Sequence, residues 1–491
     1  MQENRFSRRA VLCRMIGLLM VFMLAAGSLP AVSAAEAGEE IRISVSYPST
    51  LHKDAMIDDT IVFSDAWFSG NPEERNDRLG LVSAQMTALS GDGEKATEVL
   101  RQLGFADAEA KRYDSELTGD CGYVIGSKTI TRNGKAATLN AVVFQGLKYG
   151  VKGWLQNVTI NTDQVRKGDH ASYAEAARFF MEDLAEMNRE GEQVFWLCGL
   201  SRAGAIANTV SARLLEQEVP PAVFCCTFEA PTDTDREEAH DARYLGIHNY
   251  YCTDDLVPRI PFWGMVRYGQ DISLDEVPLE AVQKMLTEQD PEAEEEVMKV
   301  TDSFREEVSS VLDRICLRIG ALIENREDYS RIRMVDVPGN IAFDYTWQEG
   351  FQTLSQLVFG NNQDLVEHFE KMQKEKTDDS ETPMNILRTR RATLKLIAGR
   401  SEDFRNVERL TMASLGNQML KAYLDQPVLT EDLFAILGIL DAMLLPAPGE
   451  ETGEEELPDP IDVFEKYGSS LLFSHYPEVV ITRMKILVQT L

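Results

Sequence analysis

The sequence predicts an α/β sandwich, in which a mainly parallel β-sheet is covered by helices on both faces. Apolar runs typical of buried strands alternate with amphipathic runs typical of helices through the middle of the chain. Strands are predicted over 137–145, 193–198, 222–228 and 245–252, and helices over 172–187 and 203–215. Near-continuous apolar strands between helices favour a parallel sheet, because such a sheet is buried on both faces.

The flanking regions complete the predicted architecture. Residues 40–46 alternate as an edge strand, and 75–89 and 96–103 have the pattern of covering helices. From 268 to 466 the pattern is helical only, and it ends in a charged, Pro/Gly-rich stretch over 446–460 that we expect to be mobile. The functional reading of this insertion is a lid over the site, and the alternative is a packed accessory lobe that never moves.

The predicted domain organisation follows from these patterns and from the N-terminal segment. Residues 1–15 carry four arginines, 16–29 are nearly all apolar, and small residues at 32–34 or 35–37 offer a cleavage site, which together indicate a bacterial-type export signal. The apolar stretch is short for a membrane span. We therefore expect an export signal (1–34), a first part of the core (35–267), a helical insertion (268–466) and a return to the core (467–491), in a secreted or envelope protein. The general and the twin-arginine export routes both remain open.

The charge and the cysteines limit the classes of partner and site. The whole chain has a net charge of −31, and residues 1–34 carry four arginines and one glutamate, so their removal takes away +3 and leaves −34. Such an acidic protein is not drawn to nucleic acid or to anionic lipid by charge. Four cysteines, Cys198, Cys225, Cys226 and Cys252, lie in predicted strands, which favours buried free thiols over a disulfide framework. No spacing suggests a metal site, and no cofactor is expected.

A candidate nucleophile lies where a predicted strand reverses into a predicted helix. Ser201 follows the apolar run 194–198, with Gly199 two residues before it and Ala203 two residues after it. A strained strand-to-helix turn needs small residues at those positions, and it lifts the serine Oγ above the sheet edge. The backbone N–H of Arg202, at the helix N-terminus, would face a developing oxyanion.

Candidates for the remaining members of a catalytic triad follow later in the chain. Asp254 and Asp255 come directly after the last predicted strand, so an aspartate there would share a sheet edge with Ser201. The histidines after them are His368 and His475. His368 lies between glutamates in a helical pattern, whereas His475 lies on a predicted loop after the insertion, which favours His475 as the general base.

At these motifs the chain resembles the bacterial branch of the class 3 lipase family, α/β-hydrolases that cleave carboxylic esters. Residues 144–147, 199–204, 255–258 and 474–478 are similar to the family's oxyanion loop, nucleophile elbow, acid motif and histidine motif, in that order. The resemblance implies an α/β-hydrolase sandwich and favours Asp255, three residues before a proline, over Asp254. It also implies Leu147 and Arg202 as backbone oxyanion donors. One departure is that Leu147 stands where the family usually has a threonine or serine hydroxyl.

The sequence thus predicts an exported serine esterase or lipase that uses Ser201, His475 and Asp255 on an ester or lipid substrate. The alternative is a catalytically weak or silent envelope-associated binding protein on a hydrolase scaffold, which Leu147 and the large insertion favour. Hydrolysis of amides or of polysaccharide acetyl groups by the same triad is a third reading. A transient contact of the helical lobe with a lipid interface is also expected, and the sequence does not fix an oligomeric state.

Overall fold

The computed structural model describes residues 40–52, 55–115, 119–146, 168–187, 190–260, 265–324, 334–337, 340–343 and 466–490. The expected export signal (1–34), Leu147, His368 and the charged segment 446–460 lie outside the described residues. The predicted strands and helices of the hydrolase core lie within them.

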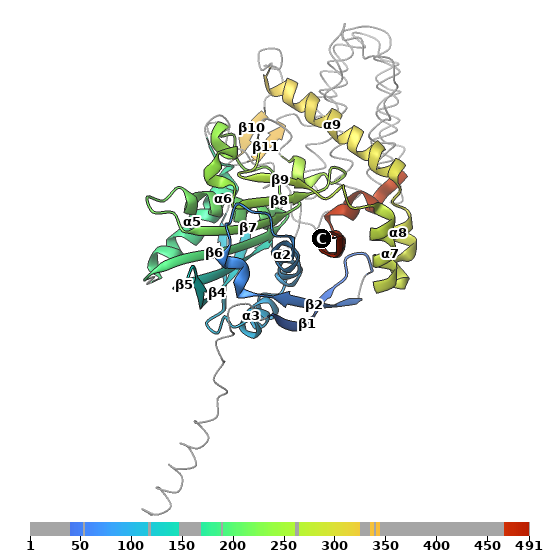
Figure 1. Ribbon diagram of the computed structural model, residues 1–491. Coiled ribbons are helices and arrows are strands. Elements are labelled where there is room, and N and C mark those ends of the chain that lie inside the picture. The colour runs from blue at the N-terminus through green and yellow to red at the C-terminus, as the bar shows by residue number, and fades with distance from the viewer. Residues whose placement is uncertain are drawn as a thin grey trace, which may run out of the picture.

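The central element is a seven-stranded sheet in the order β3-β4-β5-β6-β7-β8-β9 (Figure 1). β4 pairs antiparallel with both β3 and β5, whereas β5 to β9 run parallel to one another. Their bounds are β3 Glu109–Ser115, β4 Gly119–Arg132, β5 Lys135–Gly146, β6 Glu192–Leu200, β7 Ala222–Phe228, β8 Ile247–Tyr251 and β9 Gln270–Ser273. The carboxyl ends of the parallel strands therefore share one edge, as the sequence predicted.

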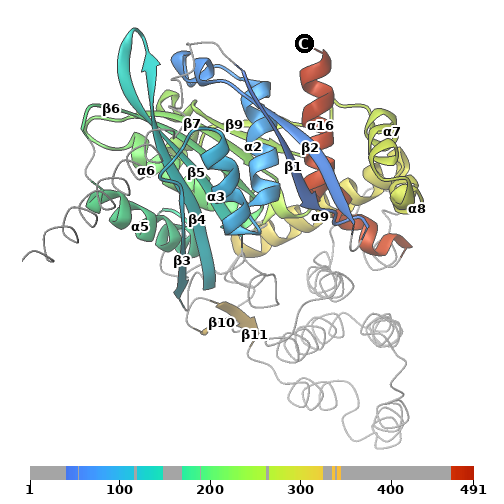
Figure 2. The ribbon, with the colours of Figure 1, turned by 90° about the horizontal axis from the view of Figure 1, so that it is seen from below.

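Helices from different parts of the chain cover the two faces. Figure 2 shows α5 to one side of the sheet and α2, α3 and α16 to the other. The bounds are α2 Asp77–Leu89, α3 Gly93–Gln102, α5 Ala171–Glu186, α6 Arg202–Leu215, α7 Leu279–Gln289, α8 Glu294–Met298, α9 Asp302–Glu324 and α16 Pro477–Thr490, with short 3₁₀ turns between them. The connections β5–α5–β6 and β6–α6–β7 are right-handed crossovers, which place α5 and α6 on the same face of the sheet. The other face is covered by α2, α3 and α16, which come from before and after these strands in the chain.

The core on the α2 side is organised around Trp196 of β6. Its ring lies 5.4 Å from the ring of Phe63 and 5.9 Å from that of Phe68, measured between centroids. The indole N–H donates to Ser83 Oγ at 2.8 Å, so the one polar atom of this buried ring is satisfied. Met484 of α16 belongs to the same buried cluster, which ties the segment around His475 to the sheet.

Three observations correct the expected organisation. β1 (Ile41–Pro48) is a strand, but it pairs only with β2 (Met56–Phe63) in a separate two-stranded sheet. β9 lies inside the segment expected to be purely helical and forms the edge of the central sheet, and β10 (Met334–Val337) pairs with β11 (Asn340–Phe343). β9, β10 and β11 have four residues each, which is too short for a period-two pattern to be distinguished from a loop.

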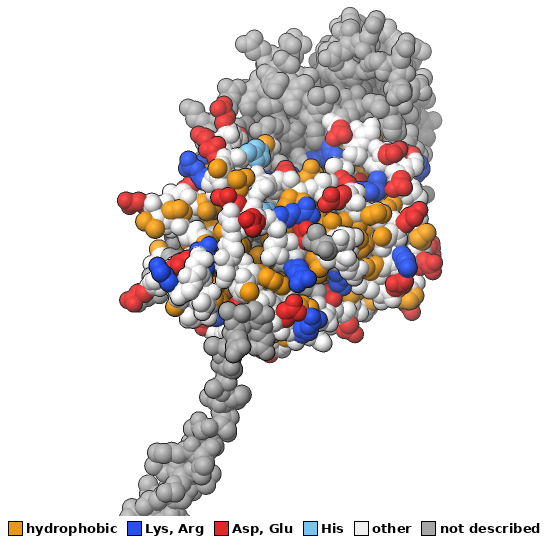
Figure 3. All heavy atoms as spheres, in the orientation of Figure 1, with side chains coloured by type: hydrophobic (Ala, Val, Ile, Leu, Met, Phe, Trp, Pro, Cys, Tyr) orange, Lys and Arg blue, Asp and Glu red, His pale blue; other side chains and the backbone are white. Residues whose placement is uncertain are grey.

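The surface and the thiols agree with a folded acidic domain. Figure 3 shows one face, on which acidic and basic side chains are interspersed with apolar ones. The cysteines predicted as buried free thiols, Cys198, Cys225, Cys226 and Cys252, are buried and free. Among the described residues, no helix has both the length and the apolar composition of a membrane span.

Candidate active site

Ser201 forms the turn between β6 and α6. Its φ of 59° and ψ of −135° are unusual for a residue with a side chain, and its N–H donates to the carbonyl of Phe228 at 2.8 Å. Such a conformation costs about 1 to 3 kcal/mol and persists only where the surrounding structure fixes it. The strand pairing of β6 with β7 and the start of α6 supply that constraint, so the turn is strained as the motif predicts.

Close backbone contact explains the small residues around the turn. A Cβ atom on Gly199 would lie 2.3 Å from the carbonyl oxygen of Ala203, and one on Gly204 would lie 2.8 Å from Cβ of Ala230. Ala203 is 1% exposed, so a larger side chain there has no room. Gly199 and Ala203 therefore have the packing role that the sequence indicated for them.

Asp255 and His475, which are 220 residues apart, are joined by a short hydrogen bond. His475 Nδ1 lies 2.6 Å from Oδ2 of Asp255, whose carboxylate is fully buried. The other oxygen, Oδ1, accepts the N–H of Val257 at 3.0 Å. A buried carboxylate bonded to Nδ1 holds an imidazole in the tautomer whose Nε2 is free to accept a proton.

Ser201 lies at the same sheet edge, but its Oγ is covered. Ser201 is 1% exposed, and its Oγ has no hydrogen-bond partner among the described residues. β7 joins the two halves of the edge, since its last residue accepts from Ser201 and the N–H of Glu229 donates to Tyr250 O of β8 at 2.9 Å. Among the described residues, the serine and the carboxylate–histidine pair thus lie at one edge, and no hydrogen bond joins Ser201 Oγ to His475.

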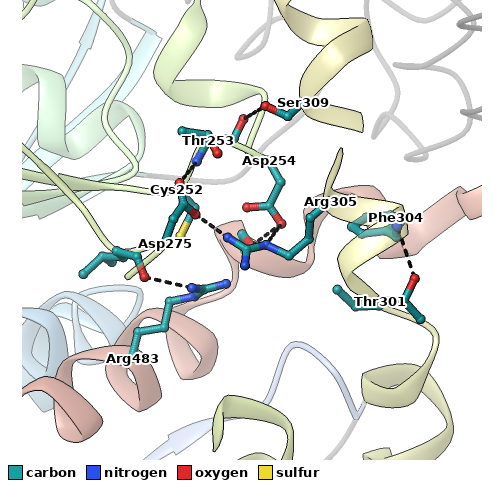
Figure 4. A network of polar contacts seen from close by, with 12 residues as sticks. Cys252, Thr253, Asp254, Asp275, Thr301, Phe304, Arg305, Ser309 and Arg483 are labelled. Carbon is teal, nitrogen blue, oxygen red and sulfur yellow. Dashed lines mark hydrogen bonds and ion pairs between the residues drawn. The ribbon is translucent and has the colours of Figure 1, made fainter. Parts of the chain in front are cut away.

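Asp254 has different partners from its neighbour. Its Oδ2 accepts Ser474 Oγ at 3.0 Å and Arg305 Nε at 3.2 Å, and the Arg305 guanidinium also donates to Asp275 (Figure 4). Arg305 comes from α9, so an ion-pair network fastens the start of the insertion to the loop after β8. Asp254 therefore serves packing, whereas Asp255 contacts the histidine.

Further contacts attach α9 to the same loop. Ser309 Oγ donates to the carbonyl of Thr253 at 3.4 Å, and Arg259 donates to Ser309 Oγ at 3.1 Å and pairs with Asp313. Residues 305, 309 and 313 are spaced by four, so they lie on one face of the helix. This part of the insertion is packed against the core. The prediction of a lid or a fixed lobe concerns the rest of the insertion, most of which lies outside the described residues.

One group of potential metal ligands lies in this network. Ligand atoms of Cys252, Asp254 and Asp275 lie within 4.8 Å of one another, the one such group found among the described residues. Burial raises the pKa of the Cys252 thiol, which opposes the thiolate that a metal needs. The Arg305 guanidinium already balances both carboxylates, so the group has the chemistry of an ion-pair network.

Of the two expected oxyanion donors, one can be described. The N–H of Arg202 lies in the first turn of α6, directly after Ser201, whereas Leu147 lies outside the described residues. Gln145, near the end of β5, is fully buried and donates from Nε2 to the carbonyl of Ser90 at 2.7 Å. The side-chain amide N–H of Gln145 is therefore used in a hydrogen bond on the α2 side of the sheet.

Glu229 is a residue at this edge that the sequence analysis did not identify. It follows β7 directly, is fully buried and has a φ of +44°. The available signal was its place, because a charged residue directly after an apolar strand lies at the edge where active sites of such sheets form.

The mainly parallel sheet, the serine on a strained strand-to-helix turn and the buried carboxylate–histidine pair define an α/β-hydrolase fold. The predicted α/β-hydrolase fold class is confirmed, whereas the predicted all-helical insertion is not.

Comparisons with known proteins place this chain near lipases. The sequence model of the family "Lipase (class 3)" matches residues 141–265, from within β5 to a few residues beyond the acid motif 255–258, and supports a lipase-type ester hydrolase. No curated protein matched. Among solved structures, the chain is similar to the Rhizomucor miehei lipase propeptide complex at 15% identity, covering 39% of this chain and 67% of that one, with a TM-score of 0.28.

Two further solved structures have the same level of similarity. The lipase from Rhizopus microsporus var. chinensis is 14% identical over 42% of this chain and 77% of its own, with a TM-score of 0.29. The triacylglycerol lipase from Penicillium expansum is 14% identical over 40% of this chain and 80% of its own, with a TM-score of 0.27. These scores are low, so the fold assignment rests on the strand order and on the turn at Ser201.

Proposed function

We propose that the protein is a serine ester hydrolase of the lipase type, in which Ser201, His475 and Asp255 form the catalytic triad. The observation that carries the proposal is the 2.6 Å contact between His475 Nδ1 and Asp255 Oδ2, at the sheet edge where the strained Ser201 turn lies. A buried carboxylate–histidine pair beside a strained serine has few purely structural uses, because burying a charge costs free energy unless it is compensated.

The chemistry assigned to these residues is acyl transfer to serine and then to water. His475 Nε2 takes the proton of Ser201 as Oγ attacks the ester carbonyl, and Asp255 stabilises the imidazolium. His475 then gives the proton to the leaving alcohol. Water attacks the acyl-enzyme by the same route and releases the acid. No step requires a cofactor.

The developing oxyanion would be held by the backbone N–H groups of Arg202 and Leu147. Relatives with a hydroxyl at the position of Leu147 have one further donor, and loss of one oxyanion donor costs about 3 to 4 kcal/mol in a hydrolase where this was measured. We therefore expect a low turnover number for a hydrolase of this fold.

One observation favours a second candidate function, a binding protein on a hydrolase scaffold. Ser201 is 1% exposed, so an ester reaches its Oγ only after a neighbouring group moves aside. A catalytically silent protein would not need that movement. The two candidates differ in whether Ser201 reacts.

The experiment that separates them is hydrolysis of p-nitrophenyl esters from acetyl to palmitoyl by the purified protein, Ser201→Ala and His475→Ala. We expect activity in the first protein and a loss in both variants, and the chain-length profile then distinguishes an esterase from a lipase. Equal baselines for all three, with intact circular dichroism spectra, would contradict the proposal. Acetylated sugars and amides in the same assay test the related substrate classes.

We also propose that the protein is exported through residues 1–34 and acts on ester or lipid substrates outside the cytoplasm, where the helical lobe makes a transient contact with a lipid interface. N-terminal sequencing of the protein from the medium or envelope should begin near residue 35. Retention of residues 1–34 in the cytoplasmic fraction would contradict export. Vesicle flotation tests the lipid contact.

A further inference from the structure

Glu229 occupies a strained position between the two halves of the site. Among the described residues, three that are not glycine have a positive φ: Asn133 in the turn between β4 and β5, Ser201 and Glu229. The turn explains Asn133, and the nucleophile turn explains Ser201. Glu229 has a φ of +44° directly after β7, where glycine would be unstrained. Strain of this kind is held by the surroundings and is concentrated at functional sites.

The carboxyl group of Glu229 is directed at the turn that carries Asp255. Oε2 accepts the N–H of Cys252 at 3.0 Å, and the N–H of Asp255 closes the turn on the carbonyl of Cys252 at 3.3 Å. Glu229 is fully buried, and Oε1 has no hydrogen-bond donor among the described residues. Asp255 is a close neighbour of this carboxyl group, since its charge and a side-chain hydrogen bond with it both raise the pKa of Glu229.

Two buried carboxyl groups in contact are compatible only if one of them holds a proton. Asp255 accepts Val257 N–H and His475 Nδ1, two donors that favour its ionised form. Glu229 has two donors, both on Cys252: the backbone N–H and the thiol, which is a weak donor. Burial first, and the charge of Asp255 second, raise the pKa of Glu229 well above its ordinary value. The proton therefore belongs to Glu229, and its O–H is the donor of the contact.

The charged groups around Glu229 come from three other elements. Arg483 of α16 is fully buried and donates to the carbonyl of Leu274 at 3.0 Å, and Asp254 and Asp275 both attract its charge. Arg305 of α9 is paired with the same two aspartates. On the remaining side lies the Asp255–His475 pair. Arg483 is the cation whose charge interacts directly with that of Glu229, and Asp254 and Asp275 share it.

We propose that Glu229 is a positioning residue for the active site, which holds the Asp255 carboxylate through an O–H···O hydrogen bond and so fixes the orientation of His475. The catalytic part of this inference rests on the proposed function, whereas the proton on Glu229 does not. The site then has a row of three groups, Glu229, Asp255 and His475, in which the first is neutral and the second is charged.

The protonation state is tested without substrate by infrared difference spectroscopy on the purified protein and Glu229→Gln at neutral pH. We expect the carbonyl stretch of a protonated carboxyl group in the difference spectrum. Asp233→Asn is the matched control, because Asp233 is another fully buried carboxyl whose pKa burial raises, and it should remove a separate band. Loss of ionised carboxylate bands alone from Glu229→Gln would overturn the proposal.

The positioning role is tested by the pH dependence of kcat/KM. Glu229→Leu, which cannot donate, should lower kcat about 10- to 100-fold, because a misplaced catalytic group costs up to about 100-fold. Glu229→Gln, whose amide donates to Asp255 but does not titrate, should recover most of that loss and keep its activity to higher pH than the unchanged protein. The positioning role would be refuted if the alkaline limbs of the pH profiles of Glu229→Gln and the unchanged protein superimpose. It would also be refuted if both variants lose the same share of kcat while their folds are intact. No esterase activity in any protein, together with a protonated-carboxyl band, would refute the proposed function and leave the proton on Glu229 established.

Discussion

The two halves of the candidate site are built by different means. Around Ser201 the packing residues Gly199, Ala203 and Gly204 are small and neutral, and the geometry comes from the close approach of backbone at these positions. Around Asp255 and His475 the chain is assembled from segments 220 residues apart, and charged groups such as Arg305 hold it together. The nucleophile half is fixed by local sterics, whereas the acid–histidine half is fixed by compensated charges.

The largest expected effect distinguishes the two adjacent aspartates of the charged half. Asp255→Asn should lower kcat about 10⁴-fold, because the amide no longer holds His475 in the required tautomer, and this corresponds to about 5.5 kcal/mol in the barrier. Asp254→Asn, which keeps an acceptor for Ser474, should stay within about 10-fold. Ester hydrolysis with both variants checks this, and equal losses would contradict the assignment.

A substitution in the neutral half should act through stability. Gly199→Ala places a Cβ 2.3 Å from Ala203 O, a backbone atom that cannot move without disturbing α6. We expect a decrease of about 3 to 5 kcal/mol in the free energy of unfolding. Gly91→Ala is the matched control, since no atom lies within 4 Å of its Cβ, and it should change stability by less than about 0.5 kcal/mol. Urea denaturation measures both, and equal stabilities would refute the packing argument.

Removal of the cation from the charged half should be nearly as destabilising. Arg305→Met removes the ion-pair partner of the Asp254 and Asp275 carboxylates, which should cost about 3 kcal/mol in thermal or urea unfolding. The triple variant with both aspartates changed to asparagine should recover part of this loss. Arg42→Met, which breaks an exposed pair, is the control and should cost less than about 0.5 kcal/mol. If the free-energy changes of the three substitutions simply add in the triple variant, the ion-pair network is contradicted.

The smallest effect concerns Asp233, whose pKa is raised well above 3.8, chiefly by burial. The folded protein then holds a proton that the unfolded chain releases, so the free energy of unfolding falls as the pH rises from 3.8 to the folded pKa. Asp233→Asn should reduce that slope by up to about 1.4 kcal/mol per pH unit. Asp58→Asn, at an exposed position, should leave the slope unchanged. Denaturation across this pH range measures both slopes, and a slope unaltered in Asp233→Asn would show that Asp233 is ionised.

Strongly patterned segments of the fold were predictable from the sequence. The apolar strands that became β5 to β8 and their helices lie within a few residues of the expected bounds. β3 and β4 were not anticipated, because polar residues interrupt their runs. A signal for β4 was present in Asn133-Gly134, two residues with positive φ that form the tight turn between β4 and β5.

The site was predictable only where its geometry is local or where a motif marks it. The Ser201 turn follows from six consecutive residues, and the preference for His475 over His368 follows from its place on a predicted loop. The choice of Asp255 over Asp254 depended on the family resemblance. Arg305 and Glu229 carry no local signal for their partners. Their roles arise because α9 and the end of β7 pack against the loop that carries Asp255. The residue pattern of a single segment does not encode such a tertiary arrangement.

The long stretch of chain between β8 and the segment around His475 also affects the order in which the parts of the site form during folding. Closing a loop of this length costs about 5 kcal/mol of chain entropy, which the packing of α16 on α2 must offset. Ser201 and its turn belong to a contiguous stretch that needs no such closure. We therefore expect a newly made chain to acquire its nucleophile before its base, so that partly folded molecules carry an inert serine and the onset of reactivity reports completion of the fold.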